Sequence, residues 1–289
     1  MPSERAEDNG RPKTCLFVVV GAQRTGTNIL REILNTNERI AMLGEVLSPS
    51  EAPSYWGNFI ASRGLGWVPP TLADTESLLG RYLEFIEYRI RNHWVDGDKR
   101  GCTAIGMDIK YSQLREIAPA GWSSEAPPYL LGYLRARNAI IVHAVRRNVI
   151  QCAISAMIAE QRGVWHNYAG SVIDGSYRVD TEQCLASARA IVRQREQFLK
   201  CSEGLPVVTS CYEDLVNAIA QRDPAGHIPE VAEPLRSIAR ALGVTRGFRY
   251  ATRLRKAINV PYARLLSNYA ELVDAVTRSE FAHLAPSLD

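Results

Sequence analysis

The stretch Val18-Val19-Val20-Gly21-Ala22-Gln23-Arg24-Thr25-Gly26-Thr27-Asn28-Ile29-Leu30 decides how the rest of the chain is interpreted. An apolar, β-branched run ends at Gly21, a short polar loop follows, and apolar residues then recur at helical spacing. In a strand, tight loop and helix of this kind, backbone N–H groups and a helix N-terminus converge on an anion. The stretch therefore predicts an anion-binding loop, with an ordinary strand-to-helix turn as the alternative.

The glycines of this loop have the spacing of a Walker A motif, but its lysine is missing. Four residues separate Gly21 from Gly26, and Thr27-Asn28 stand where Lys and Ser or Thr would follow. Without that lysine the loop is suited to a phosphate but not to the β/γ-phosphates and Mg²⁺ of ATP. Arg24 is the cation that remains inside the loop.

The rest of the chain alternates between strand patterns and helical patterns. We expect strands at 39–47, 104–110, 139–145 and 206–211, and helices at 74–92, 149–161, 181–203, 230–243 and 263–284. This alternation predicts an α/β fold, with a P-loop-type parallel β-sheet flanked by helices on both faces in three layers. The segments 48–72 and 162–180 are expected to be long loops that cover or line a site. Residues 1–14 are expected to be a disordered lead-in and 15–289 a single domain.

Polar residues follow the predicted strands at the points where these strands end. They are Arg24, Glu45, Lys110, Arg147 and Tyr212-Glu213. Because ligands of parallel sheets bind at the carboxyl ends of the strands, we expect these side chains to face one crevice.

Composition narrows the class of protein. The net charge is only +3, so a general electrostatic attraction to nucleic acid is not expected. Only five of the 34 basic residues are lysines, and arginine suits bidentate recognition of phosphate and sulfate. The six cysteines are scattered and no apolar run is long enough to span a membrane, which favours a cytoplasmic protein. The sequence leaves the oligomeric state open, including a homodimer.

A second anion site is indicated by Arg147 and Ser155. The arginine ends the predicted strand 139–145, and the serine lies eight residues later within the following helix. Two turns of helix place that hydroxyl on the face that begins at the arginine, and the pair is suited to hold a phosphate. The alternative is a basic strand end followed by a packed serine.

Together the two sites resemble the sulfotransferases that use 3′-phosphoadenosine 5′-phosphosulfate (PAPS). The loop 23–28 matches the family's first loop, where Thr usually stands in place of Asn28, and 141–155 matches its 3′-phosphate motif. The strand 105–113 is similar to one in the bacterial carbohydrate branch of the family. Tyr212-Glu213-Asp214-Leu215 and Asn268-Tyr269 resemble two later motifs. The resemblance covers residues 15 to about 275 in the family's order.

This resemblance implies a sulfotransferase-like fold and activity. The enzyme would move a sulfuryl group from PAPS to a hydroxyl of a carbohydrate, a glycolipid or a glycosylated natural product. The product of the donor would be adenosine 3′,5′-bisphosphate, and no metal would be needed. The residues implied to bind the cofactor are Gln23, Arg24, Thr25, Gly26, Thr27, Asn28, Arg147, Ser155, Tyr212, Arg255 and Lys256.

Three residues are candidates for catalysis. Arg24 is expected to stabilise the leaving oxygen, and Lys110 either assists on the sulfuryl side or is an exposed strand-end cation. Glu45 follows the loop helix at the place where the bacterial branch has its general base, so the resemblance implies that role; a solvated acid is the alternative. His166 is the rival base.

The acceptor is expected to contact the aromatic loops. Trp56, Trp165 and His166 are the candidate residues, since indole rings stack on sugars, although the tryptophans suit a lid or the core equally well. Two other functions stay open. One is a metal-dependent P-loop kinase that uses Asp108 and Glu213 for Mg²⁺, and the other is a non-catalytic nucleotide-binding protein.

Overall fold

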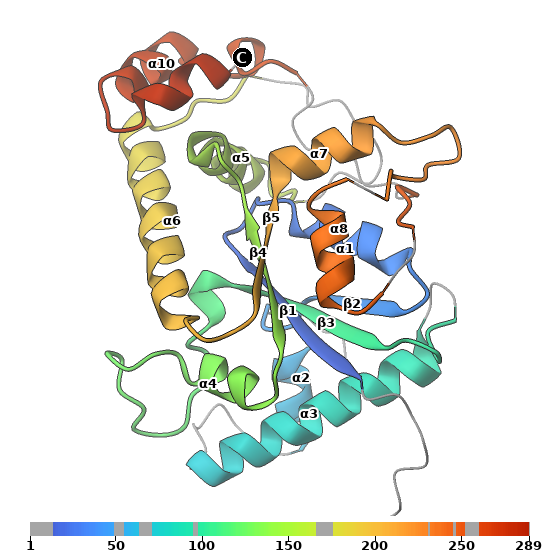
Figure 1. Ribbon diagram of the computed structural model, residues 1–289. Helices are drawn as coiled ribbons and strands as arrows, with labels where there is room; N and C mark the ends of the chain where they lie inside the picture. The colour runs from blue at the N-terminus through green and yellow to red at the C-terminus, as the bar shows by residue number, and fades with distance from the viewer. Residues whose placement is uncertain are drawn as a thin grey trace, which may run out of the picture.

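The computed structural model describes residues 14–48, 55–63, 71–94, 98–165, 176–230, 232–244, 247–251 and 260–288. Within these ranges five strands form one sheet, in the order β2-β3-β1-β4-β5, and every pair is parallel (Figure 1). The strands are β1 (Cys15–Gly21), β2 (Ile40–Glu45), β3 (Ala104–Lys110), β4 (Ile140–Val145) and β5 (Val207–Cys211).

The sheet is built around β1, the strand that precedes the glycine loop. It pairs with β3 on one side and with β4 on the other. Its last residue, Gly21, lies opposite Lys110 of β3 and Ala144 of β4, so the carboxyl ends of these strands meet at one edge. Continuous apolar runs suit central parallel strands, because both of their faces are covered.

Helices cover both faces of the sheet, and the predicted three-layer α/β architecture is confirmed. Alternate residues of β1 point to opposite faces: Val18 and Val20 belong to one hydrophobic cluster, and Phe17 and Val19 to another. The first cluster packs against α2 (Trp56–Ala61), α3 (Leu72–His93) and α4 (Tyr129–Ala136). The second packs against α1 (Thr27–Asn35), α7 (Tyr212–Ala220) and α8 (Leu235–Ala241).

A third cluster lies beyond the carboxyl ends of the strands. It joins α5 (Val149–Arg162) and α6 (Thr181–Cys201) to α9 (Tyr262–Leu265), α10 (Tyr269–Thr277) and the 3₁₀ helix η2 (Ala282–Ser287). The C-terminal part of the chain lies over α5 in Figure 1. The Asn148 side chain, which caps α5, donates a hydrogen bond of 2.7 Å to Ser287 Oγ. The C-terminal segment is thus fixed beside the end of β4.

Three predictions from the sequence differ from the structure, and one of them is the helix expected at 230–243, which is shortened to α8. The segment 48–72 was expected to be irregular, yet it contains α2, whose Trp56, Phe59 and Ile60 are buried at helical spacing. The helix expected at 263–284 is divided into α9, α10 and η2, because the backbone is extended at Leu266 and Asn268 begins a new helix. Short helices of this kind depend on tertiary packing, which a local pattern does not show.

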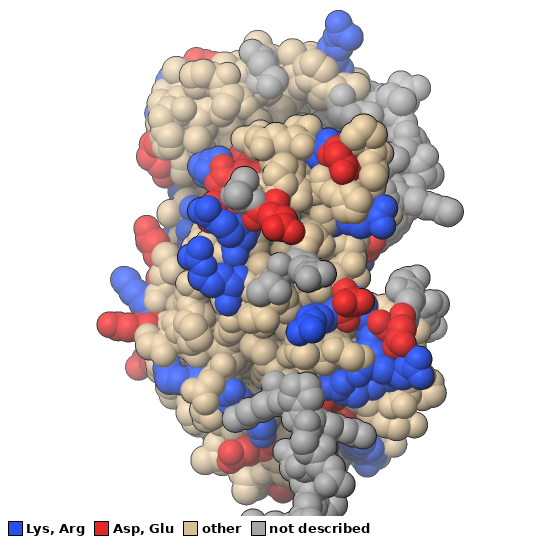
Figure 2. Space-filling model, turned by 45° about the vertical axis from the view of Figure 1, so that its right-hand side comes forward, with Lys and Arg blue, Asp and Glu red and all other residues tan. Residues whose placement is uncertain are grey.

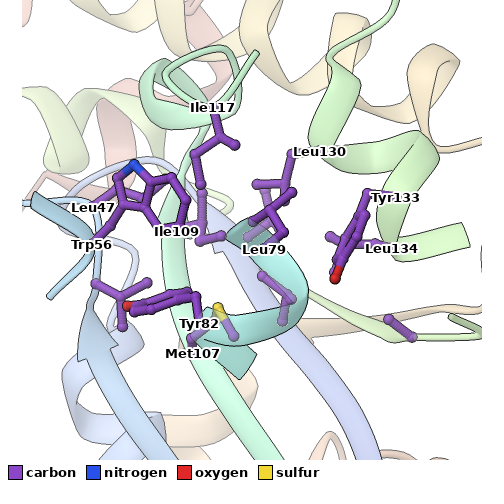
Figure 3. Close-up of a cluster of buried hydrophobic side chains, with 14 of the residues drawn as sticks. Leu47, Trp56, Leu79, Tyr82, Met107, Ile109, Ile117, Leu130, Tyr133 and Leu134 are labelled. Atoms are coloured by element: carbon purple, nitrogen blue, oxygen red, sulfur yellow. The ribbon is translucent and has the colours of Figure 1, made fainter. Parts of the chain in front are cut away.

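The core on the α3 face is closely packed. Figure 3 shows the buried side chains of Leu79, Tyr82, Ile109 and Leu130. They line a cavity of about 20 Å³, and the whole lining is apolar except for its tyrosine hydroxyls. That volume is about one water molecule, so this space is a packing defect and not a binding site.

Candidate functional site

The loop between β1 and α1 has the shape that an anion-binding loop requires. Gly26, the residue before α1, has φ 82°, and Arg24 has φ 65°, so both adopt left-handed backbone. The Thr25 hydroxyl donates to the Ala22 carbonyl at 2.8 Å and closes the loop. A Cβ on Gly26 would lie 2.4 Å from the ring of Tyr212, so only glycine fits here.

Arg24 lies inside the site and reaches across to α5. Its Nε donates to Ser155 Oγ at 3.0 Å and one terminal nitrogen donates to the Trp165 carbonyl at 2.5 Å. Burial lowers the pKa of Arg24, and the neighbouring Arg146 guanidinium lowers it further. The structure thus brings together two of the predicted cofactor-binding residues, which are 131 positions apart in the chain.

Lys110 delivers an ammonium group to the beginning of α1. Its Nζ donates to Thr27 Oγ1 at 2.8 Å and to Asp108 Oδ2 at 2.7 Å, and it lies 3.4 Å from Glu45 Oε1. The side chain is only 3% exposed, so the alternative of an exposed strand-end cation is wrong. Pairing of β3 with β1 places this lysine opposite Gly21, and its side chain reaches Thr27, the position where a Walker lysine would stand.

Glu45 is the more accessible acid of this group. It ends β2, and its side chain is 25% exposed, whereas that of Asp108 is 2% exposed. One carboxylate oxygen faces Lys110 and the group is still reached by solvent. A carboxylate held in place by a lysine and open on one side has the geometry that a general base needs.

Two adjacent arginines after β4 have opposite surroundings. Arg147, the predicted phosphate ligand, is 58% exposed and forms two hydrogen bonds to the Asp214 carboxylate, at 2.6 and 3.0 Å. Arg146, which the sequence did not single out, is 6% exposed and lies 4.8 Å from the Tyr212 ring centroid. One of its terminal nitrogens donates to Gln151 Oε1 at 2.7 Å. Doubled arginines were the only signal for it in the sequence.

The two tryptophans predicted to contact the acceptor lie in different surroundings. Trp56 is buried and packs edge-on against Tyr82 at 5.1 Å between ring centroids, so of the roles left open for it the structure supports packing in the core. Trp165 is 40% exposed and contacts Arg24 through its backbone carbonyl. His166, Arg255 and Lys256 lie outside the described residues.

The remaining loop residues line the site or support it. Gln23 is exposed, and its carbonyl accepts a hydrogen bond from the Cys152 thiol at 3.0 Å. Asn28 is partly buried in the first turn of α1. Within the described ranges, no three His, Cys, Asp or Glu side chains come together as a metal site, and none of the described helices combines the length and apolar character needed to cross a membrane.

Comparisons with known proteins give a distant likeness. No family model matches the chain, and no curated protein matches it. A crystal structure of a sulfotransferase from Alicyclobacillus acidocaldarius is similar over 95% of this chain and 96% of that one, with 14% sequence identity and a TM-score of 0.42. A likeness at this level does not establish a family. The observed fold and site define a three-layer α/β protein with an arginine-containing glycine loop at the carboxyl edge of its sheet.

Proposed function

We propose that the protein is a sulfotransferase that takes the sulfuryl group from PAPS and transfers it to a hydroxyl of a carbohydrate, a glycolipid or a glycosylated natural product. The observation that carries this proposal is the pair of cations at the glycine loop. Arg24 lies within the loop, and Lys110 reaches the start of α1 from the neighbouring strand. A phosphosulfate has oxygens of lower charge than the terminal phosphates of ATP, and two such cations with backbone donors suit it.

The residues have distinct roles in the proposed reaction. The loop 23–28 and the N-terminus of α1 hold the 5′-phosphosulfate. The acceptor oxygen attacks sulfur, and the bond from sulfur to the 5′-phosphate oxygen breaks in line with it. Negative charge grows on that phosphate oxygen, where Arg24 stabilises it, and Lys110 assists on the sulfuryl side. Glu45 takes the proton of the acceptor hydroxyl, and the products are a sulfate ester and adenosine 3′,5′-bisphosphate.

A kinase reaction is supported less well by the acids of the site. Asp108 and Glu213 are the acids that would have to hold Mg²⁺ in that case. The Asp108 carboxylate already accepts a hydrogen bond from Lys110, and the Glu213 carboxylate accepts from the backbone N–H groups of Arg147 and Asn148. Both acids are therefore engaged in holding the chain.

The donor is tested by calorimetric titration with adenosine 3′,5′-bisphosphate and, separately, with ATP and Mg²⁺. We expect the bisphosphate to bind in the micromolar range and ATP to bind at least tenfold more weakly. Tight binding of Mg-ATP without a response to the bisphosphate would contradict the proposal and favour the kinase.

Catalysis is tested by transfer of radiolabelled sulfate from PAPS to a panel of sugars and glycolipids. Replacing Glu45 by Gln should reduce turnover by about 10²- to 10⁴-fold while bisphosphate binding is kept. The matched control is Glu84→Gln, on the exposed face of α3, which should leave turnover unchanged. Turnover by Glu45→Gln at the level of the control would exclude Glu45 as the base, and bisphosphate binding without turnover on any acceptor would favour the non-catalytic alternative.

A further inference from the structure

Three guanidinium groups, one of them from the glycine loop itself, converge on Cys152 of α5. Arg24, Arg146 and Arg195 all lie close enough to Cys152 of α5 to lower the pKa of its thiol, which burial nevertheless raises to about 11. They come from three elements: the loop after β1, the end of β4, and α6. Arg195 also donates to the Arg146 carbonyl at 3.1 Å, which ties α6 to this position.

The three arginines are not paired with an acid in the part of the chain that the structure describes. Several exposed arginines of the described ranges are, as in Arg147–Asp214 at 2.6 Å and Arg189–Glu280 at 2.7 Å. Others, such as Arg135 and Arg222, donate to backbone carbonyls. Figure 2 shows basic side chains beside acidic ones on one face. Among the described residues, none of the three arginines around Cys152 forms a salt bridge.

The nearby Glu213 carboxylate balances at most one of these three positive charges. Glu213 begins α7, but its carboxylate accepts hydrogen bonds from the backbone N–H groups of Arg147 and Asn148, at 3.1 and 3.2 Å, and from the Cys211 thiol at 3.0 Å. A cation held away from water without a counter-charge is unfavourable unless an anion binds to it. The cluster therefore has the charge of an anion site.

Two members of this cluster, Arg146 and Arg195, have a buried Nε without a hydrogen-bond partner among the described residues. Arg146 is the more deeply buried of the two, with 6% of the residue exposed. Its guanidinium stacks on Tyr212, whose ring in turn packs against Gly26 of the loop. This chain of contacts fixes Arg146 beside the loop, on the side where Arg24 holds Ser155 at 3.0 Å.

We propose that Arg146, together with Ser155, binds a second phosphate of the nucleotide, and that Arg147 does not. This rests on the proposed function, in which that group is the 3′-phosphate of PAPS. A charge-assisted hydrogen bond to phosphate is strong where water is excluded, as it is at Arg146. Arg147 instead joins β4 to α7 through Asp214, and this hydrogen bond raises the pKa of Arg147.

The adjacent arginines provide a matched pair of variants. Arg146→Gln and Arg147→Gln are titrated with adenosine 3′,5′-bisphosphate and with adenosine 5′-monophosphate, which lacks the 3′-phosphate. We expect Arg146→Gln to weaken bisphosphate binding about 10- to 100-fold and monophosphate binding less than threefold. Arg147→Gln should change both affinities less than threefold.

Two outcomes would overturn the assignment. One is a large loss of bisphosphate binding in Arg147→Gln with little loss in Arg146→Gln. The other is an equal loss for both nucleotides in Arg146→Gln, which would place this arginine at the 5′-group. Should Arg146→Gln fail to fold, Arg146→Lys keeps the charge and removes the fork of donors, and a selective loss of about fivefold or more for the bisphosphate is expected.

If the protein does not use PAPS, the titrations of the wild-type protein will show it separately from the choice between Arg146 and Arg147. If the wild-type protein binds the two nucleotides equally, the PAPS donor is wrong, and the anion site is then judged with inorganic sulfate alone. Stabilisation against heat by sulfate that is lost in Arg146→Gln or Arg146→Lys and kept in Arg147→Gln supports the anion site. The same stabilisation in all variants overturns it.

Discussion

Acid should destabilise the protein through His143, a residue in the middle of β4. The imidazole is 2% exposed, and its Nε2 lies 2.5 Å from the Tyr111 hydroxyl. Burial lowers the pKa of His143 to about 4, and the positive charge of Arg195 acts in the same direction. The folded protein therefore holds this histidine neutral at pH values where the unfolded chain binds a proton.

The sign and the size of the effect follow from this difference. The pKa is about 6.5 in the unfolded chain and about 4 in the folded protein. The stability contributed by the neutral His143 is fully present above pH 6.5 and is lost as the pH falls towards 4. At about 1.4 kcal/mol per pH unit the whole effect is about 3.4 kcal/mol, of which about 2.5 kcal/mol is lost by pH 4.5.

The assay is urea unfolding at pH 7.0 and 4.5 of the wild-type protein and of His143→Gln. Glutamine does not titrate and keeps a polar partner for the tyrosine hydroxyl. Between the two pH values, the free energy of unfolding should fall by about 2.5 kcal/mol more in the wild-type protein than in the variant. The control His283→Gln removes an exposed imidazole and should lose as much as wild type. If the free energy of unfolding falls by the same amount in wild type and in His143→Gln between pH 7.0 and 4.5, His143 is not the cause of the acid sensitivity.

Three further predictions concern the site and the sheet. Lys110→Met leaves two carboxylates without their cation, and we expect a loss of about 3–5 kcal/mol in urea unfolding, so a loss below 1 kcal/mol would contradict the buried network. Gly26→Ala puts a methyl group against the Tyr212 ring on left-handed backbone; we expect a loss of at least about 2 kcal/mol and, by calorimetry, weaker nucleotide binding. In Gly106→Ala, the new Cβ would lie 2.1 Å from the Phe17 ring, and differential scanning calorimetry should show a loss of about 1–3 kcal/mol, with an unchanged melting temperature as the contrary result.

The sequence predicted the sheet well because its strands are buried on both faces. Such strands appear as continuous apolar runs ended by glycine or polar residues, and the runs at β1 and β4 have little other explanation. The expectation that Glu45 and Lys110 lie together depended only on both ending strands of one parallel sheet. Their separation of 3.4 Å arises from the adjacency of β2 and β3, which the order of segments along the chain does not reveal.

The surroundings of the residues just beyond the strands were not predictable in the same way. The strand period ends at Val145, so the sequence does not indicate which of Arg146 and Arg147 turns inward. That choice is made by distant partners: Asp214 of α7 holds Arg147 at the surface, and the Tyr212 ring covers Arg146. Trp56 illustrates the same limit, because its burial against Tyr82 depends on the path of α3.

The strand order places the proposed acceptor side and the proposed nucleotide side on opposite sides of the glycine loop. Glu45 lies at the end of β2, at one edge, and Tyr212 follows β5, at the other, with the glycine loop of β1 between them. Lys110 faces two carboxylates, so the β2 side of the loop has no excess positive charge and suits a neutral hydroxyl acceptor better than an anion.

The β4 side of the loop has the opposite character. Arg24 and Arg146 lie there without acidic partners among the described residues, so this side suits the multiply charged nucleotide. Sulfur bound above the loop would have the acceptor oxygen on the β2 side and the leaving phosphate on the β4 side, which is the in-line arrangement that sulfuryl transfer requires. In the proposed reaction, Arg24 of the loop and Lys110 of the neighbouring β3 take the place of the lysine that the loop lacks.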